Sequence, residues 1–359
     1  MNIAYDVHGN QFIPESELAG LSDLLPNRLL IWHDEFKGNK IDPSKWRNLF
    51  GQGSTSTWLT YAEDLAKVTQ VSGGLKYRCL KDFPKPSVGA KYSSTYIMTQ
   101  GLFEFRYGRI EAKIKFPNVT PHHTTFWTLG APVERKSVSQ FEMWETTEGV
   151  LFPSCGEIDI AEYDDGAVGA RTHWSNGGFD TSATYQTGGN IATLTTTPND
   201  WHIYACEWTE SAITFYVDGV QKGTWDTSNG AVSGWNPFQI PHFLILNCVV
   251  SLAGEQSWDM AQTEVAWVRV YAPSGVTAPV AETAISIDSA KSVSVGGRVY
   301  LSPTFTPANP TDMTLNWKSH NEDIVTCYGG LLVGKSAGTT YVQCTTKNGL
   351  TALCKVTVS

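Results

Sequence analysis

The chain has 359 residues, of which 41% are hydrophobic and 17% are charged, and its formal net charge at pH 7 is -9. It has no Lys/Arg cluster, which excludes a nucleic-acid binder, and no run of about 18 apolar residues, which excludes a helical membrane span. Aromatic residues make up 12%, including 13 Trp and 14 Tyr, as expected for a large β-rich core or for a groove lined by rings.

The chain begins with a polar, weakly patterned stretch, and we expect an N-terminal extension over residues 1–27. From residue 28 to residue 272, short apolar or alternating runs recur between clusters of Gly, Asn, Pro and Ser. Helical periodicity is nearly absent, and the dipeptide Asp218-Gly219 between two such runs is typical of a hairpin turn. The pattern predicts an all-β sandwich or barrel over residues 28–272.

The composition then changes. Residues 273–283 are small, include Pro and lack a pattern, which predicts a linker with few residues able to pack. Residues 284–359 show short alternating runs with the length and rhythm of a small immunoglobulin-like sandwich. We expect this second domain to be dispensable for catalysis.

Seven cysteines are dispersed through the predicted strands, and none forms a CxxC pair, so their spacing fits no zinc site. We predict mostly buried free thiols. One disulfide among Cys327, Cys344 and Cys354 remains an alternative.

The segment CGEIDIAEYDD places three acids, Glu157, Asp159 and Glu162, on one predicted strand. Side chains alternate between the two faces of a strand, so Glu157 and Asp159 share a face. Glu162 lies five positions after Glu157 and would point the other way in a regular strand. A β-bulge at Ile160-Ala161 would add one residue and bring all three acids to the same face.

Cleavage of a glycosidic bond requires two carboxyl groups. One protonates the leaving oxygen, and the other attacks the anomeric carbon or activates water. The reaction retains the configuration when the two groups are about 5–5.5 Å apart. No Lys or Arg lies within eight residues of the motif to neutralise the acids. On spacing alone, an exposed acidic strand, a metal site and a catalytic pair all remain open, and Asp159 is expected to shift the pKa of a neighbouring Glu by charge coupling.

The stretch GEIDIAEY resembles the catalytic motif of glycoside hydrolase family 16 in its bulged, laminarinase-like form. Other stretches resemble that family in the same order, from WHDEFKGNKIDPSKW through TTFWTLG to VAWVRVYA. The resemblance implies a concanavalin-like β-jelly-roll sandwich with a cleft, formed by residues 28–272. It also implies that Glu157 is the nucleophile, that Glu162 is the general acid/base and that Asp159 tunes the nucleophile.

The same resemblance suggests substrate-binding residues. Trp127 matches an aromatic near the cleaved bond, with core packing as the alternative, and His173 and Trp174 follow one strand after the acids. Three further aromatics fall where the family builds subsites: Trp58, Tyr61 and Tyr96. His123-Thr124 replaces the usual Trp-Pro, so we expect rebuilt subsites.

Many family members bind a structural calcium ion through a Glu like Glu35 and an Asp in the last strand. Ala266 stands at the Asp position here, so the sequence argues against calcium, and we expect no metal site and no cofactor.

The region from Pro307 through Trp317 to the Gly329-Gly330 turn resembles the bacterial immunoglobulin-like group 2 repeat. This second resemblance covers residues 284–359 and implies a non-catalytic spacer or adhesive module.

These features predict a monomeric retaining endo-β-glycanase that hydrolyses β-1,3- or mixed-linkage β-1,3/1,4-glucan by double displacement. The alternatives are a red-algal galactan hydrolase of the agarase, porphyranase or carrageenase type, a transglycosylase, or a non-catalytic carbohydrate-binding protein. The expected location is extracellular, on the cell surface or on a virion, although MNIAYDVHGNQF lacks the basic and apolar regions of a signal peptide.

Overall fold

The computed structural model describes residues 21–52, 59–82, 91–120, 122–133, 149–150, 152–164, 166–177, 185–195, 197–232, 234–250 and 257–359. Within these ranges almost every regular element is a β-strand, and the single α-helix, α2 (Leu65–Val68), has four residues. Two 3-10 helices are also present, η1 (Thr227–Gly230) and η2 (Pro237–Gln239). The predicted all-β fold is confirmed.

Eleven strands form the larger sheet. Nine of them run in the order β16 (Val220–Asp226), β15 (Ala212–Val217), β14 (Trp201–Trp208), β9 (Gly108–Lys115), β18 (Met260–Tyr271), β6 (Leu75–Lys81), β7 (Tyr92–Ser94), β4 (Leu59–Tyr61) and β3 (Gly51–Gln52). The other two attach at its side, β1 (Leu30–Asp34) to β18 and β5 (Thr69–Val71) to β6. The hairpin predicted at Asp218-Gly219 joins β15 to β16, with both residues at positive φ (49° and 77°), as a type I′ turn requires.

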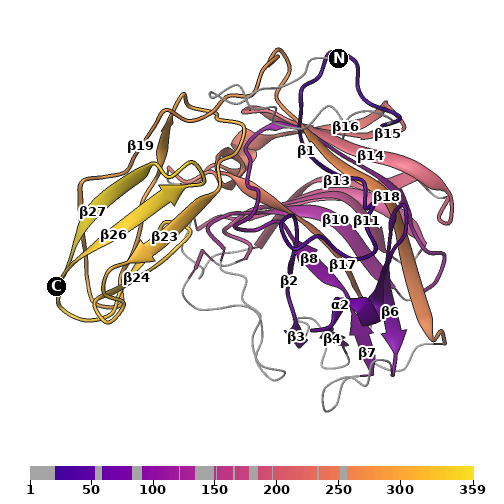
Figure 1. Ribbon diagram of the computed structural model, residues 1–359, viewed down its shortest axis with the longest axis horizontal. Helices are drawn as coiled ribbons and strands as arrows, with labels where there is room; N and C mark the ends of the chain where they lie inside the picture. Colours follow the sequence, from indigo (N-terminus) through magenta and orange to yellow (C-terminus); the bar gives the residue numbers. More distant parts are fainter. Residues whose placement is uncertain are drawn as a thin grey trace.

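Seven strands form the second sheet, which carries the three acids. Its order is β13 (Tyr185–Thr195), β12 (Ala167–Ser175), β11 (Glu157–Asp164), β10 (His123–Gly130), β17 (His242–Val249), β8 (Tyr96–Met98) and β2 (Arg47–Asn48). One face packs on the larger sheet, where the ring of Tyr163 in β11 stacks on Phe116 at 6.1 Å. The two sheets form the sandwich that occupies the right side of Figure 1, and the opposite face of β11 is left for the acids.

The C-terminal strands form three small sheets beside the sandwich (Figure 1). These sheets are β19 (Ala284–Ser286) with β22 (Thr304–Thr306); β20 (Ala290–Val293), β27 (Thr351–Val358), β26 (Gly338–Thr346) and β23 (Leu315–Ser319); and β21 (Arg298–Tyr300), β25 (Leu331–Gly334) and β24 (Val325–Tyr328). They enclose a hydrophobic cluster of their own that includes Leu301, Val342 and Val356. The bacterial immunoglobulin-like assignment and the proposed domain boundaries stay predictions.

The segment 273–283, predicted as a linker with few residues able to pack, contacts both parts of the chain, and the linker assignment stays a prediction. Val276 packs against the core of the sandwich. The amide of Val280 donates a hydrogen bond to Oγ1 of Thr311 at 2.8 Å, which ties the segment to the C-terminal part. Sequence composition could not reveal these long-range contacts, because they depend on where the C-terminal sheets dock.

The C-terminal sheets dock on the sandwich through backbone and ring contacts. The amide of Glu104 donates to Oγ1 of Thr314 at 2.8 Å, and the amide of Met313 donates to the carbonyl of Glu104 at 2.7 Å. The ring of Trp235 meets the edge of Tyr300 at 5.0 Å. Trp235 of the sandwich and Tyr300 of the C-terminal part therefore bury aromatic surface against each other at this junction.

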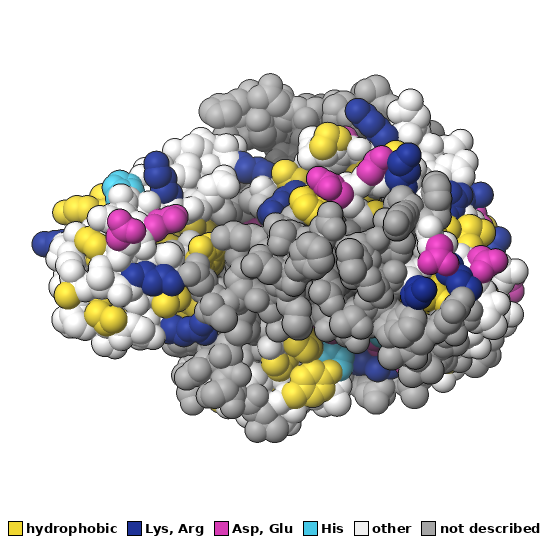
Figure 2. Space-filling view, turned by 90° about the horizontal axis from the view of Figure 1, so that it is seen from below, with side chains coloured by type: hydrophobic (Ala, Val, Ile, Leu, Met, Phe, Trp, Pro, Cys, Tyr) yellow, Lys and Arg dark blue, Asp and Glu magenta, His cyan; other side chains and the backbone are white. Residues whose placement is uncertain are grey.

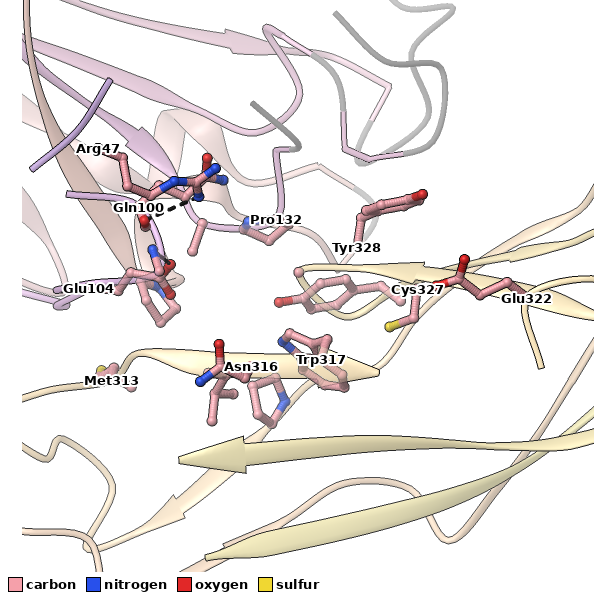
Figure 3. Close-up of a pocket in the computed structure, with 17 residues that line it drawn as sticks. Arg47, Gln100, Glu104, Pro132, Met313, Asn316, Trp317, Glu322, Cys327 and Tyr328 are labelled. Carbon is pink, nitrogen blue, oxygen red and sulfur yellow. Dashed lines mark hydrogen bonds between the residues drawn. The ribbon is translucent and has the colours of Figure 1, made fainter. Parts of the chain in front are cut away.

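A cavity of about 290 Å³ lies at the junction (Figure 3). It is lined from the sandwich by Arg47, Gln100, Glu104 and Pro132, and from the C-terminal part by Met313, Asn316, Trp317, Glu322, Cys327 and Tyr328. None of the three predicted catalytic acids lines it. Burial raises the pKa of the Glu104 carboxyl to about 8, so this group is neutral in the folded protein at pH 7.

All seven cysteines are free thiols, and all except the partly exposed Cys327 are buried, as predicted. The alternative of a disulfide among the three C-terminal cysteines is therefore wrong.

On the face shown in Figure 2, Lys and Arg side chains of the C-terminal sheets are interspersed with Asp and Glu side chains, so no patch of one charge sign forms there. Among the described residues, no helix has the length and apolarity needed to cross a bilayer.

Candidate active site

Strand β11 is irregular between its second and third acids. On the side of β10, Trp127 lies opposite Asp159 and the preceding Phe126 lies opposite Ala161. Ile160 therefore has no counterpart on β10. One extra residue on one strand defines a β-bulge, and the bulge predicted at Ile160-Ala161 is confirmed.

The same irregularity appears on the side of β12. Arg171 lies opposite Asp159, and Gly169 lies opposite Glu162. The chain thus advances three positions on β11 where it advances only two on β12. The bulge brings Glu162 back to the face of Glu157 and Asp159. The apolar members of the strand lie in the core: Ile158, Ile160, Ala161 and Tyr163.

Glycine fixes the entry into β11. Gly156 has φ +79°, a left-handed conformation that side chains disfavour, and a Cβ at this position would lie 2.6 Å from Cβ of Pro237. The close approach and the turn both require glycine. The turn brings the chain into the sheet so that Glu157 is the first residue of the strand.

His173 of β12 links two of the acids. Its Nε2 lies 3.2 Å from Oδ2 of Asp159 and 3.7 Å from Oε1 of Glu157. Its Nδ1 lies 2.5 Å from the hydroxyl of Tyr185. The imidazole is thus held between a tyrosine on β13 and two carboxyl groups on β11.

Asp159 is 2% exposed. Burial and the charge of Glu162 raise its pKa, and the hydrogen bond with His173 opposes this effect only in part. Asp159 therefore binds a proton more readily than an ordinary aspartate. The charge of Glu162 thus acts on Asp159, while the expected shift of a glutamate pKa by Asp159 stays a prediction.

Glu162 lies between two nitrogen-bearing side chains. Nε2 of His123 is 2.9 Å from its Oε1, and Nε of Arg171 is 2.7 Å from its Oε2. Burial alone would raise the pKa of Glu162. The hydrogen bond and charge of His123, together with the charge of Arg171, outweigh burial and lower it. In turn, Glu162 raises the pKa of His123 against the effect of burial.

Three donor atoms, from Glu157, Asp159 and His173, lie within 4.8 Å of one another, a spacing that a metal ion could bridge. The Nε2 of His173 lies 3.2 Å from Oδ2 of Asp159, and the hydroxyl of Tyr185 lies 2.5 Å from its Nδ1 and 3.5 Å from its Nε2. This arrangement satisfies both ring nitrogens without an ion. We assign no metal to these residues.

The position suggested for calcium is occupied by an arginine. Nε and Nη2 of Arg269 bind the two carboxylate oxygens of Glu35 at 2.8 and 2.9 Å. The resulting bidentate pair is buried on the Arg side. The carboxylate of Glu35 is therefore engaged in a structural ion pair.

Trp127 on β10 lies opposite Asp159, and Tyr96 lies on β8, on the other side of β17. Nε1 of Trp127 donates to Oδ1 of Asn247 at 2.8 Å, and its ring, 8% exposed, meets Tyr96 edge-on at 6.2 Å. Tyr96 is 1% exposed, so it supports Trp127 rather than presenting its own ring to a sugar. Substrate contact by Trp127 and His173 stays a prediction.

The prediction of Trp174 as a substrate-binding residue is wrong. Its ring lies in the core, 5.0 Å from Trp225 and 6.3 Å from Phe238. It is adjacent to His173 in a strand, so the two side chains point to opposite faces. Trp58 and the side chain of Tyr61 lie outside the described residues, although the backbone of Tyr61 ends β4.

The family model of glycosyl hydrolases family 16 matches residues 83–269, just over half of the chain. The chain belongs to glycosyl hydrolases family 16. Membership confirms its assignment as a glycoside hydrolase, and glycosidases of this family generally need no cofactor.

The names of proteins similar to this chain refer to different glycans. A β-glucanase of Rhodothermus marinus is 30% identical over 70% of this chain and 87% of its own length. A keratan-sulfate endo-1,4-β-galactosidase of Sphingobacterium multivorum is 28% identical over 72% of this chain, which spans only 60% of that protein. The crystal structure of a LamA variant from Z. galactanivorans, in complex with laminaritriose and laminaritetraose, matches with a TM-score of 0.56 and 27% identity, covering 68% of this chain and 99% of that one.

Three residues around the acids were not singled out as functional from sequence: His123, Arg171 and Tyr185. His123 was noted only as a departure from the family pattern, and the other two were missed. Arg171 could have been found by counting along the hairpin, because an Asp-Gly dipeptide at 165–166 separates β11 from β12. Arg171 is also two positions before His173 and so shares its face.

Proposed function

We propose that this protein is a retaining endo-β-glycanase with Glu157 as nucleophile and Glu162 as general acid/base. The bulge in β11 carries the proposal, because it brings both glutamates to one face with Asp159 between them. Cleavage of a glycosidic bond uses two carboxyl groups flanking that bond, and retention further requires them to lie about 5–5.5 Å apart. A non-catalytic binding protein on the same fold would not need all three acids.

In the first step, Glu157 attacks the anomeric carbon while Glu162 donates its proton to the departing glycosidic oxygen. A covalent glycosyl-enzyme forms and the leaving sugar chain departs with that proton. In the second step, Glu162 removes a proton from water, which attacks the same carbon and releases Glu157. Capture by a second sugar instead of water would make the enzyme a transglycosylase.

Asp159 supports the nucleophile. Burial and the charge of Glu162 raise its pKa, so Asp159 binds a proton more readily than an ordinary aspartate. A proton on Asp159 removes the repulsion that a second carboxylate exerts on the ionised Glu157. His173 contacts both groups and fixes their relative positions.

The first candidate substrate is β-1,3- or mixed-linkage β-1,3/1,4-glucan, supported by the β-glucanase relative and by the laminarin oligosaccharides in the LamA variant. The second candidate is a β-galactan, supported by the keratan-sulfate relative and by the cationic side chain of Arg171 beside Glu162. We also propose an extracellular or particle-borne location, a monomer, and a non-catalytic immunoglobulin-like module over residues 284–359.

Digestion of a polysaccharide panel tests the proposal. Laminarin, lichenan, barley glucan, agarose, porphyran and carrageenan are incubated with the protein, and products are sized to separate internal from terminal cleavage. Proton NMR of the first product records the anomer formed. An α-anomer as the initial product from a β-linked substrate, or failure to cleave any member, would contradict a retaining endo-β-glycanase.

A further inference from the structure

The proposed general acid is held in an unsuitable state in the free protein. A general acid must carry its proton when the substrate arrives. Glu162 instead contacts Arg171 at 2.7 Å and His123 at 2.9 Å, and both stabilise its carboxylate form. Some change on binding must release Glu162 from at least one of these partners before it can donate a proton.

Of the two partners of Glu162, Arg171 is the one held less firmly by its surroundings. Its side chain is 28% exposed, whereas the structural Arg269, which grips both oxygens of Glu35, is fully buried. Nε of Arg171 lies 2.7 Å from Oε2 of Glu162 without the geometry of a hydrogen bond, and within the described part of the chain no hydrogen bond holds the two terminal nitrogens of Arg171. Gly169, opposite Glu162, has no side chain to confine the guanidinium.

A guanidinium with its two terminal nitrogens free suits a bidentate anion such as a sulfate ester or a carboxylate. A neutral glycan offers Arg171 only hydroxyl groups, which compete poorly with the carboxylate of Glu162. We propose that the substrate polysaccharide carries a sulfate ester or a carboxylate on a sugar beside the cleaved bond, and that Arg171 binds this anion and leaves Glu162. The inference rests on the proposed function, and it makes Arg171 the residue that selects the substrate class.

The exchange explains how Glu162 becomes an acid. Once Arg171 pairs with the substrate anion, Glu162 loses one of the charges that favour its ionised form, its pKa rises, and it takes up a proton from the buffered solvent. The other polar groups around it stay in place: Asp159 on its own strand, His123 on β10, His173 on β12 and Tyr185 on β13. The anion therefore both orients the sugar and prepares the proton donor, whereas an uncharged glycan leaves Glu162 ionised.

Matched substrate pairs test this inference. Porphyran and keratan sulfate are each compared with their chemically desulfated forms, and laminarin is compared with laminarin oxidised to the carboxylate at C6. We expect the wild-type protein to cleave the preferred anionic glycan with a kcat/KM at least about tenfold above that of its uncharged form. The sulfated and oxidised arms show which anion is used.

Arg171→Gln should bring the ratio between the paired substrates close to one, and Arg171→Lys, which keeps the charge, should retain part of it. On uncharged glycans, Arg171→Gln should also move the alkaline limb of the kcat/KM profile to higher pH, which a purely structural role would not do. Equal cleavage of paired substrates by the wild-type protein overturns the inference and leaves the proposed function intact, and so does an unchanged ratio in a folded Arg171→Gln variant. If no glycan is cleaved, the proposed function itself fails.

Discussion

Oδ2 of Asp159 lies 3.2 Å from Nε2 of His173, on the neighbouring strand. The contact anchors the middle acid of the cluster to β12, while the two flanking glutamates lie on the same face with different partners. Glu157 approaches the same imidazole at 3.7 Å, and Glu162 is paired with Arg171 and His123. One strand therefore presents three carboxyl groups in three distinct environments, which is what a division of catalytic roles requires.

Replacing either flanking glutamate should remove catalysis and preserve the fold. Glu157→Gln removes the attacking group, and Glu162→Gln removes the proton donor, and each change should lower kcat by at least about a hundredfold. Initial rates on the best substrate of the panel and melting temperatures measure the two effects. Asp164→Asn is the matched control, because it changes an exposed acid at the end of the same strand and should keep near wild-type activity.

Near wild-type turnover in either Glu variant would show that the assigned roles are wrong. Azide distinguishes the roles further. It should restore activity to Glu157→Gly by attacking the anomeric carbon from the vacant face, and the resulting glycosyl azide should have the α-configuration.

The bulge can be tested by deletion. Removing Ala161 leaves one residue between Asp159 and Glu162, and alternation then keeps all three acids on one face, so we expect a folded protein with reduced activity. Removing Ile160 and Ala161 together turns Glu162 toward the core and buries an unpaired charge, at a cost of about 3–5 kcal/mol. That variant should be inactive and poorly folded by circular dichroism. Equal melting temperatures for the two deletion variants would contradict the claim that the bulge sets the face on which Glu162 lies.

The buried Glu104 should make stability depend on pH. Its pKa is raised from 4.5 to about 8, mainly by burial, so the folded protein retains this proton where the unfolded chain has lost it. The stabilising contribution is fully present below pH 4.5 and is lost as pH rises to about 8. Its size is on the order of 5 kcal/mol as an upper limit.

Glu104→Gln mimics the neutral carboxyl and keeps the oxygen that accepts a hydrogen bond from the amide of Gly101. We expect it to raise the free energy of unfolding at pH 8.5 and to change it little at pH 4.5, measured with urea. Glu63→Gln serves as the control, because it changes an exposed acid and keeps the buried carboxyl of Glu104. A variant with the same pH dependence as the wild-type protein would show that Glu104 is ionised in the folded state.

Truncation after Tyr271 should weaken the fold but leave the chemistry. Trp235 would lose its contact with Tyr300, and the sandwich core would lose Val276, Leu331 and Val333. Exposing this apolar surface should lower the melting temperature by roughly 5 °C or more. Activity on short soluble oligosaccharides should persist, since the described partners of the acids all belong to the sandwich. Loss of that activity in a folded fragment would show that the C-terminal part completes the site.

The sequence predicted those features that depend on local alternation. The bulge and the shared face of the three acids follow from counting residues along one strand, and both are present. Counting also exposes an error, because adjacent His173 and Trp174 cannot face the same groove. The partners of Glu162 were harder to predict, since Arg171 lies nine residues after it and reaches it only through the pairing of β11 with β12.

The unpaired Ile160 has a consequence for how this motif can change over generations. With one residue between Asp159 and Glu162, alternation alone keeps both acids on one face, and with two residues the bulge does the same. Point substitutions at 160 and 161 can loosen the core, but they cannot convert one spacing into the other. The spaced and compact forms of the motif are therefore separated by the gain or loss of a whole codon rather than by a series of single-base steps.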